Sequence, residues 1–133
     1  MRRAARPGRR GPTGTLSEQL TLRVVLGPRA DWFTDEALEV LRTRQYVVSR
    51  LSNRVGMRLE GPALPRRITG ELRSEGAVLG AVQVPAGGRP LIFLADHPTV
   101  GGYPVIGVVH PDDLPLVAQA PPAAAVRFRV VVR

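Results

Sequence analysis

Residues 71–109 read ELRSEGAVLGAVQVPAGGRPLIFLADHPTVGGYPVIGVV, and this stretch decides the fold. It contains two apolar, β-branched runs, 77–84 and 90–95, which are joined by the turn sequence PAGG. A polar, glycine-containing loop at 96–102 follows, and a third apolar run covers 103–109. Short apolar runs separated by turn residues are typical of strands. The stretch therefore predicts β-strands that carry a polar loop to one edge of a sheet, where many β-proteins build a site.

The rest of the chain predicts more short strands and two brief helices. Thr34 before two acidic residues predicts a helix that Thr34 caps and that ends near Arg44. Pro111 predicts the start of a second helix, through Gln119, with Asp112 or Asp113 as its cap. Many short strands with only two helices indicate a mainly β barrel or sandwich. The additional strands are predicted over residues 19–26, 45–50, 55–60, 68–72 and 126–130.

The length of 133 residues is that of one domain. Residues 1–17 are rich in Arg, Gly and Pro without an apolar period, so they predict a disordered leader before a folded domain at 18–133. No apolar run approaches the roughly 20 residues of a membrane helix, and no secretory signal is visible. The absence of cysteine fits a reducing compartment. We therefore expect a cytoplasmic protein with no membrane partner.

The charge of the chain is concentrated at its start. The net charge is +8, but five arginines in the first ten residues account for five of these charges, which leaves +3. Aromatic residues make up 5% of the chain and do not alternate with basic residues, as a base-stacking platform would require. The pattern argues against a nucleic-acid partner, except through the leader.

All 19 basic residues are arginine, and this excludes several chemistries. A Walker phosphate loop needs a lysine on the β- and γ-phosphates. Schiff-base catalysis and the covalent attachment of biotin also need a lysine amine. Any nucleotide or carboxybiotin that this protein works with must therefore be held by another subunit.

Several polar side chains near the loop at 96–102 are candidates for a site. His97 directly follows Asp96, so the two do not form an Asp-His relay, because neighbouring strand side chains point to opposite faces. Two histidines without helical spacing give no zinc signature, and no metal site is predicted. The sequence VGGY at 100–103 either presents backbone N–H groups to an anion or forms a tight turn.

Two further groups of polar residues leave alternatives open. Glu75 and Gln83 flank the same loop, and burying either is costly unless it is hydrogen-bonded. Each is therefore exposed or part of a polar pocket. Arg54, Arg58 and Glu60 are expected on one face of a strand, which is typical of a solvated face with a cross-strand ion pair but also fits a functional face.

Four segments carry a resemblance to a known family: 52–64 (SNRVGMRLEGPAL), 71–109, 112–119 (DDLPLVAQ) and 126–129 (VRFR). They resemble the C-terminal half of the biotin-dependent carboxyltransferase family, also called allophanate hydrolase subunit 2. The family includes the C-type subunit of 5-oxoprolinase, the KipI antagonist KipA and the carboxyltransferase part of urea carboxylase. The matches keep the family's order and spacing over 22–129, so together they are more specific than any single motif.

The resemblance implies a cyclophilin-like β-barrel with one or two short helices. It also implies a subunit of an ATP-dependent complex of the 5-oxoprolinase or allophanate hydrolase type, acting on a small cyclic amide or ureido compound. ATP would be used in the complex without a P-loop in this chain, and no biotin would be attached to this chain. The implied partner is a KipI protein or a B-type subunit of 5-oxoprolinase, with an A-type subunit as a further candidate.

The resemblance also implies site residues. Gln83 and Tyr103 would hydrogen-bond the substrate amide, and Asp96 would orient or deprotonate a nitrogen. Gly101 and Gly102 would receive a developing oxyanion or carboxylate. The implied catalytic residues are thus Asp96, Gln83 and Tyr103, and the implied substrate-binding residues are Arg54, Arg58, Glu60, Glu75, Thr99, Gly101 and Gly102.

The sequence departs from the family pattern at three points. Asn53 stands where the family usually has Asp, and His97-Pro98 replaces Arg-Gln after Asp96. Replacing Arg with His removes a fixed cation, so an anion there would be held less strongly. Full-length members are longer, and residues 18–133 are expected to lack the family's N-terminal half.

Three functional hypotheses follow. The first is a subunit of an ATP-dependent amide-hydrolysing complex of the 5-oxoprolinase type, active only in the complex. The second is a non-catalytic, KipA-like regulatory or binding partner of a KipI-type protein. The third is a nucleic-acid-associated protein that acts through its basic leader.

Overall fold

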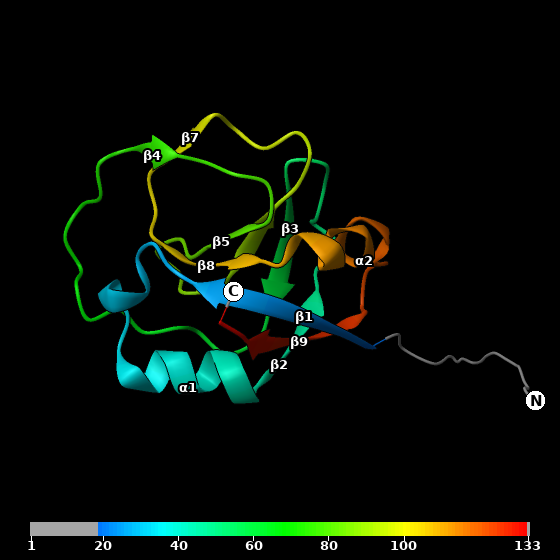
Figure 1. Ribbon diagram of the computed structural model, residues 1–133, viewed down its shortest axis with the longest axis horizontal. Coiled ribbons are helices and arrows are strands. Elements are labelled where there is room, and N and C mark those ends of the chain that lie inside the picture. The colour runs from blue at the N-terminus through cyan, green and yellow to red at the C-terminus, as the bar shows by residue number, and fades with distance from the viewer. Residues whose placement is uncertain (1–18, 133) are drawn as a thin grey trace, which may run out of the picture.

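The computed structural model describes residues 19–132, and it confirms the predicted mainly β fold (Figure 1). Seven strands close into a barrel in the order β1-β8-β5-β6-β3-β2-β9, and β4 and β7 form a separate two-stranded ribbon. Two short α-helices complete the fold. The elements in chain order are β1 (Gln19–Leu26), the 3-10 helix η1 (Ala30–Trp32), α1 (Asp35–Thr43), β2 (Gln45–Val48), β3 (Gly56–Glu60), β4 (Glu75–Gly76), β5 (Ala81–Gln83), β6 (Leu91–Phe93), β7 (Val100–Gly101), β8 (Val105–Val109), the 3-10 helix η2 (Pro111–Asp113), α2 (Leu114–Gln119) and β9 (Ala125–Val130).

The barrel closes where its first strand meets its last. β1 runs parallel to β9 over six residue pairs, from Gln19 opposite Ala125 to Val24 opposite Val130. On its other side β1 runs antiparallel to β8, with Val24 opposite Val109. The other neighbouring pairs in the barrel are antiparallel. A closed sheet has no edge strand with unpaired N–H and C=O groups, so this seam completes the backbone hydrogen bonding of the barrel.

The barrel is filled by the inward-facing side chains of its alternating strands. Leu22 and Val24 of β1 are fully buried, as are Val126 of β9 and Tyr46 of β2. The Tyr46 hydroxyl donates to the carbonyl of Pro62 at 2.7 Å, so its polar end has a partner, and burial raises the pKa of Tyr46 to about 12. The period of two that predicted these strands therefore marks the side chains of the core.

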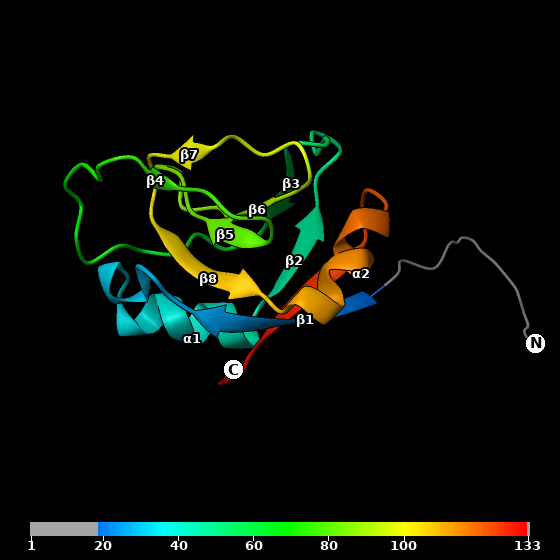
Figure 2. The same cartoon turned by 45° about the horizontal axis from the view of Figure 1, so that its top comes forward.

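α1 forms where the sequence predicted it. The Thr34 hydroxyl oxygen accepts a hydrogen bond from the N–H of Ala37 at 3.0 Å and so caps the helix. Ala37 and Leu41 are buried, and the helix packs against β9. In Figures 1 and 2, α1 and α2 lie on opposite sides of the barrel. Within residues 19–132, neither helix has the length and apolar character needed to cross a membrane.

The predicted strand at 68–72 is wrong. These residues belong to a long irregular segment, 61–74, that leads from β3 to β4 along one side of the barrel (Figures 1 and 2). The N–H groups of Arg67 and Ile68 both donate to the carbonyl of Trp32, at 2.8 and 3.2 Å. Because these donors are already used at η1, they do not join a β-ladder.

The apolar run at 77–84 forms a shorter strand than predicted. Only Ala81–Gln83 is β5, because the chain turns just before it, with the N–H of Ala81 donating to the carbonyl of Val78 at 3.1 Å. The predicted turn after β5 is confirmed: the N–H of Gly88 donates to the carbonyl of Pro85 at 2.8 Å, and β5 pairs antiparallel with β6.

The predicted capping of the second helix is also wrong. Asp113 occupies the N-cap position of α2, but its side chain makes no capping hydrogen bond. Its carboxylate instead accepts from Arg23 of β1: from the backbone N–H at 2.8 Å, from Nε at 3.1 Å and from Nη2 at 2.8 Å. The ring nitrogen Nδ1 of His110 accepts from the N–H of Asp112 at 3.2 Å and caps η2. α2 is therefore anchored to the barrel by an ion pair that spans 90 residues of sequence.

The clamp between Arg23 and Asp113 predicts a pH-dependent loss of stability. The hydrogen bonds from Arg23 lower the pKa of the Asp113 carboxyl. A lowered folded-state pKa stabilises the protein above the unfolded-state pKa of about 3.9, and this stabilisation disappears as the pH falls through the folded-state value. We expect Asp113→Asn to lower the melting temperature at pH 7 by about 5 °C, as measured by circular dichroism.

The pH dependence and a neighbouring variant control this experiment. The difference between wild type and Asp113→Asn should shrink as the pH is lowered from 5 towards 3, because protonation removes the same charge in the wild type. Asp112→Asn changes the adjacent, exposed carboxylate and should leave the melting temperature within about 1 °C of wild type. Equal losses in both variants would contradict a specific role for Asp113.

Candidate functional site

The Gln83 side chain occupies a buried position at the end of β5. It is 5% exposed, and within residues 19–132 its amide has no recorded hydrogen-bond partner. The pairing of β5 with β8 skips one residue here, since Val82 lies opposite Gly107 and Gln83 opposite Val105. Such a bulge re-aims a side chain. Of the two alternatives that the sequence left open for Gln83, the structure supports the polar pocket, because an unpaired buried amide calls for a partner.

A small cavity adjoins Gln83. Its volume is about 10 Å³, which is close to the minimum for one water molecule. Gly101 of β7 lies against it: a Cβ atom on Gly101 would be 2.7 Å from Nε2 of Gln83. A side chain larger than that of glycine at position 101 would therefore displace the amide end of the Gln83 side chain. The residues that line the cavity are Glu75, Gly76, Ala77, Gln83, Phe93, Gly101, Tyr103 and Val105.

The ribbon of β4 and β7 covers this cavity. Glu75 pairs with Gly101 and Gly76 with Val100, and in Figures 1 and 2 the ribbon lies on one side of the barrel strands. The carbonyl of Thr99 extends the ribbon by accepting from the N–H of Ala77 at 2.9 Å. The Thr99 side chain is exposed and lines none of the hollows described here.

An ion pair fastens the ribbon to the barrel. Arg29, which follows β1, donates from Nε to Oε2 of Glu75 at 3.0 Å and from Nη2 to the same oxygen. This hydrogen bonding lowers the pKa of Glu75 and raises the pKa of Arg29. The guanidinium also lies over the ring of Trp32, 6.0 Å from its centroid. The ionised Glu75 carboxylate thus joins β4 to the segment after β1 through its ion pair with Arg29.

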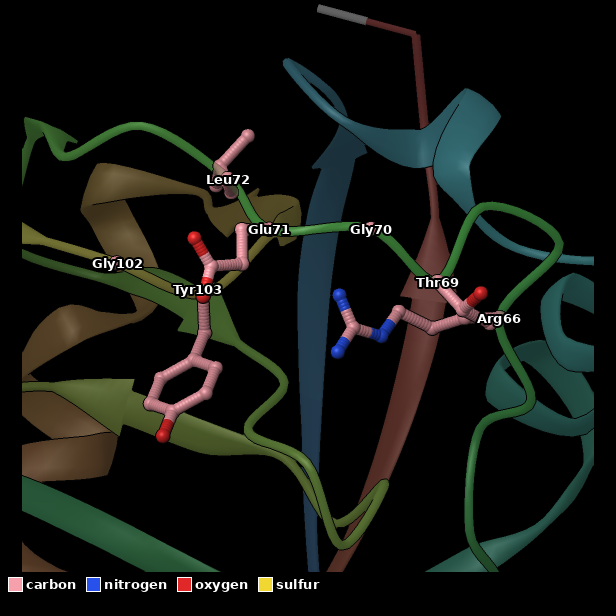
Figure 3. A pocket seen from close by; sticks show the side chains of 7 residues that line it. All are labelled: Arg66, Thr69, Gly70, Glu71, Leu72, Gly102 and Tyr103. Atoms are coloured by element: carbon pink, nitrogen blue, oxygen red, sulfur yellow. The ribbon is translucent and has the colours of Figure 1, made fainter.

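Tyr103 lines both the small cavity and a larger hollow. Figure 3 shows the residues that line the larger hollow. Its volume is about 420 Å³, within the range of small-molecule sites. Figure 3 shows Arg66 and Thr69 on one side and Glu71, Leu72, Gly102 and Tyr103 on the other, with Gly70 between them. The Arg66 guanidinium points into the hollow.

Asp96 lies apart from Gln83 and Tyr103. Its carboxylate pairs with Nε of Arg54 at 3.2 Å, and its N–H donates to the carbonyl of Arg54 at 3.0 Å. The two side chains are 53% and 85% exposed, and neither lines the small cavity or the larger hollow. The structure therefore brings Gln83, Gly101 and Tyr103 together but leaves Asp96 in a separate exposed pair. The catalytic role of Asp96 stays a prediction.

The expected common face of Arg54, Arg58 and Glu60 is corrected in part. Arg54 precedes β3, in the bend that leads into it, and does not lie on a strand face. Arg58 and Glu60 are exposed on alternate positions of β3, as predicted. Among the residues that the structure describes, neither forms an ion pair, and neither lines the small cavity or the larger hollow. Their arrangement is that of a solvated face.

His97 is placed as a loop residue. Its ring stacks on Phe93, with centroids 5.7 Å apart, and its Nδ1 lies 2.6 Å from the carbonyl of Pro98. Phe93 lines the cavity beside Gln83, so His97 packs against one of the residues of its wall. Over residues 19–132, no three His, Asp or Glu side chains gather as metal ligands would.

Three charged residues of this region were missed by the sequence interpretation. Arg29, Arg66 and Glu71 were not among the candidate site residues that the sequence predicted. Arg29 is 46 residues from its partner Glu75. No spacing rule covers such a separation, and only the fold brings these side chains together.

The fold and site define a mainly β, closed-barrel domain with a polar hollow beside the ribbon. The sequence model for the carboxyltransferase domain, subdomain A and B, matches residues 3–130. The chain therefore belongs to this carboxyltransferase domain family. The predicted leader at 1–17 lies outside the described residues, and the domain boundary at 17/18 stays a prediction.

The similar proteins agree with this family. The C-type subunit of 5-oxoprolinase from Escherichia coli is 35% identical over 107 residues, which are 80% of this chain and 34% of that protein. The protein of the same name from Haemophilus influenzae is 36% identical over 87 residues, 65% of this chain and 28% of that protein. The crystal structure of Kluyveromyces lactis urea amidolyase matches with a TM-score of 0.78 at 26% identity, covering 86% of this chain and 8% of that one. The chain thus spans about a third of the length of the curated relatives it matches.

The close approach of Gly101 to Gln83 gives a prediction for two neighbouring glycines. In Gly101→Ala the new Cβ would push against Nε2 of Gln83, so we expect a loss of about 1 kcal/mol in the free energy of unfolding, measured with urea. The matched control is Gly102→Ala, where nothing lies within 4 Å of the added Cβ, and its stability should equal that of wild type. A loss in Gly102→Ala as large as that in Gly101→Ala would contradict the packing argument.

Proposed function

We propose that this chain is part of an ATP-dependent amide-hydrolysing complex of the 5-oxoprolinase type, acting on a small cyclic amide or ureido compound. The names of the relatives support this class of activity. The observation that carries it is the buried Gln83 amide, which has no recorded partner among residues 19–132 and lies beside Gly101 and Tyr103. The NH2 group of Gln83 can donate to the carbonyl of an amide substrate, which leaves the substrate N–H for another acceptor.

The proposed roles follow from this complementarity. Gln83 and the Tyr103 hydroxyl hydrogen-bond the substrate amide. The N–H groups of Gly101 and Gly102 stabilise the negative charge that develops on oxygen when the amide carbon is attacked. Because the cavity at Gln83 has a volume of only about 10 Å³, the ribbon must shift to admit a substrate from the larger hollow. Glu75 contributes to substrate binding through the ribbon it fastens.

The other predicted site residues lie outside the cavity at Gln83, and their proposed roles require a change of conformation or a partner. Asp96 would orient or deprotonate a substrate nitrogen, which would require its loop to move towards Tyr103. Substrate contacts by Arg54, Arg58, Glu60 and Thr99 would need similar rearrangement or further residues from a partner, because these side chains are exposed.

ATP and the partners belong to the complex in this proposal. The chain has no lysine, so a phosphate loop must come from another subunit, and biotin has no attachment amine here. We propose a KipI protein or a B-type subunit of 5-oxoprolinase as the partner, with an A-type subunit as the third component. The proposal places the complex in the cytoplasm.

The first experiment co-expresses the full chain with the B-type and A-type subunits of its own organism. We expect ATP hydrolysis that depends on 5-oxoproline and disappears when this chain is left out, measured by phosphate release. A stable complex without turnover would favour the alternative, a KipA-like regulatory partner. Failure to form any complex would contradict both.

Gln83 gives the sharper test within that assay. Gln83→Leu keeps the side-chain volume but removes both hydrogen-bonding groups, so we expect turnover to fall by about 10- to 100-fold. Its melting temperature should not fall, because the variant buries no unpaired amide. The control is Gln45→Leu, an exposed glutamine on β2, which should keep wild-type turnover. Wild-type turnover in Gln83→Leu would remove Gln83 from the mechanism.

Asp96→Ala separates the catalytic from the regulatory hypothesis. If Asp96 handles a substrate proton, we expect turnover to fall about 100-fold or more while the complex still forms, as followed by size-exclusion chromatography. Because the Asp96 pair is exposed, folding should be little affected. Unchanged turnover would take the proposed role from Asp96.

A further inference from the structure

Arg66 projects from a part of the chain that is fixed on both sides. The residue pairs with Phe33 in an isolated β-bridge. The N–H of Thr34 donates to the carbonyl of Pro65 at 3.2 Å, and the N–H of Arg67 donates to the carbonyl of Trp32 at 2.8 Å. These bonds tie the irregular segment at 61–74 to the start of α1. The backbone of Arg66 is therefore held in place although it lies outside any strand or helix.

The Arg66 side chain is half-buried and has no recorded carboxylate partner among the described residues. Arg23, Arg29 and Arg54 each pair with an acid. Arg66 instead directs its guanidinium into the hollow of about 420 Å³ (Figure 3). A guanidinium presents a planar fork of donors that fits a carboxylate in two hydrogen bonds. Its position at the wall of a hollow therefore suits an anionic ligand.

The opposite wall supplies a complementary group. Glu71 lines the hollow across from Arg66, and the two side chains do not form an ion pair with each other. A carboxylate accepts hydrogen bonds from N–H groups. A ligand that spans the hollow would thus present a carboxylate to Arg66 and an N–H to Glu71. Tyr103, which borders both this hollow and the cavity at Gln83, lies on the Glu71 side.

We propose that this hollow binds the carboxylate and the neighbouring N–H of a small α-amino acid derivative, with Arg66 as the carboxylate-binding residue and Glu71 as the N–H acceptor. The inference rests on the proposed function for the nature of the reaction and specifies its substrate class. 5-Oxoproline carries its carboxylate on the carbon next to the ring N–H, so it has both groups in the required order. Bound in this way, the substrate's amide carbonyl would face Tyr103 and the cavity at Gln83.

The test compares two ligands that differ in the carboxylate. 5-Oxoproline and 2-pyrrolidone share the ring amide, and only the first carries the acid. Isothermal titration of the full chain should give at least tenfold tighter binding of 5-oxoproline, since a charge-assisted bidentate pair is worth about 1.5–3 kcal/mol, or roughly 10- to 100-fold. Arg66→Gln should abolish this preference and leave 2-pyrrolidone binding unchanged.

Two further variants control the result. Arg67→Gln changes the adjacent arginine, whose guanidinium donates to the carbonyl of Asp31, and should keep the wild-type preference. Glu71→Gln should weaken both ligands to a similar degree, because both carry the ring N–H. Equal affinity of the wild-type chain for the two ligands, or an unchanged preference in Arg66→Gln, would overturn the proposal.

The assembled complex separates this inference from the proposed function. Turnover of 5-oxoproline with an unchanged KM in Arg66→Gln would sustain the function and overturn the carboxylate site. Absence of 5-oxoproline-dependent turnover, together with carboxylate-dependent binding that Arg66→Gln abolishes, would sustain the site and overturn the function. We expect a KM raised by about 10- to 100-fold in Arg66→Gln with kcat largely unchanged, because Arg66 holds a part of the substrate that does not react.

Discussion

The parallel pairing of β1 with β9 is the constraint on which the rest of the structure depends. It joins the start of the domain to its end, from Gln19 opposite Ala125 to Val24 opposite Val130, and turns an open sheet into a barrel. Since β1 also pairs with β8, it takes part in both the seam and the neighbouring antiparallel ladder. Arg23 adds a side-chain clamp to Asp113 and so anchors α2 to the same strand. Loss of the seam would expose two strand edges and free a helix at once.

The polar site lies between two segments that are not part of the barrel. The ribbon of β4 and β7 is fastened by Arg29 and Glu75, while the segment at 61–74 is tied to Trp32 and Thr34. Neither segment is paired into the barrel, so polar groups are available between them. The scaffold is rigid where the core is packed, and the chemistry lies on loops that this scaffold positions.

The sequence predicted the central part of this site and missed its charged surroundings. Gln83, Gly101 and Tyr103 lie in the 71–109 stretch, and they meet because β5 and β8 are neighbours and β7 folds over them. Asp96 belongs to the same motif but points to Arg54, since the chain turns away after β6. Arg66 and Glu71 come from a segment whose predicted strand does not form. The spacing of a motif describes residues that are close in sequence. It does not predict which side chains from a distant segment will lie beside them in the fold.

The sequence alone determined most strands of the barrel and both α-helices. Alternating apolar residues set the strands and the core, Thr34 set the start of α1, and the absence of lysine excluded a phosphate loop. The tertiary structure decided which polar groups are paired and which remain available. The Asp113 carboxylate pairs with Arg23 and does not cap α2, and the Glu75 carboxylate pairs with Arg29. The Arg66 guanidinium faces a hollow. Local patterns fix conformation because they act within a few residues, whereas ion pairs form between side chains that only the closed barrel brings within reach.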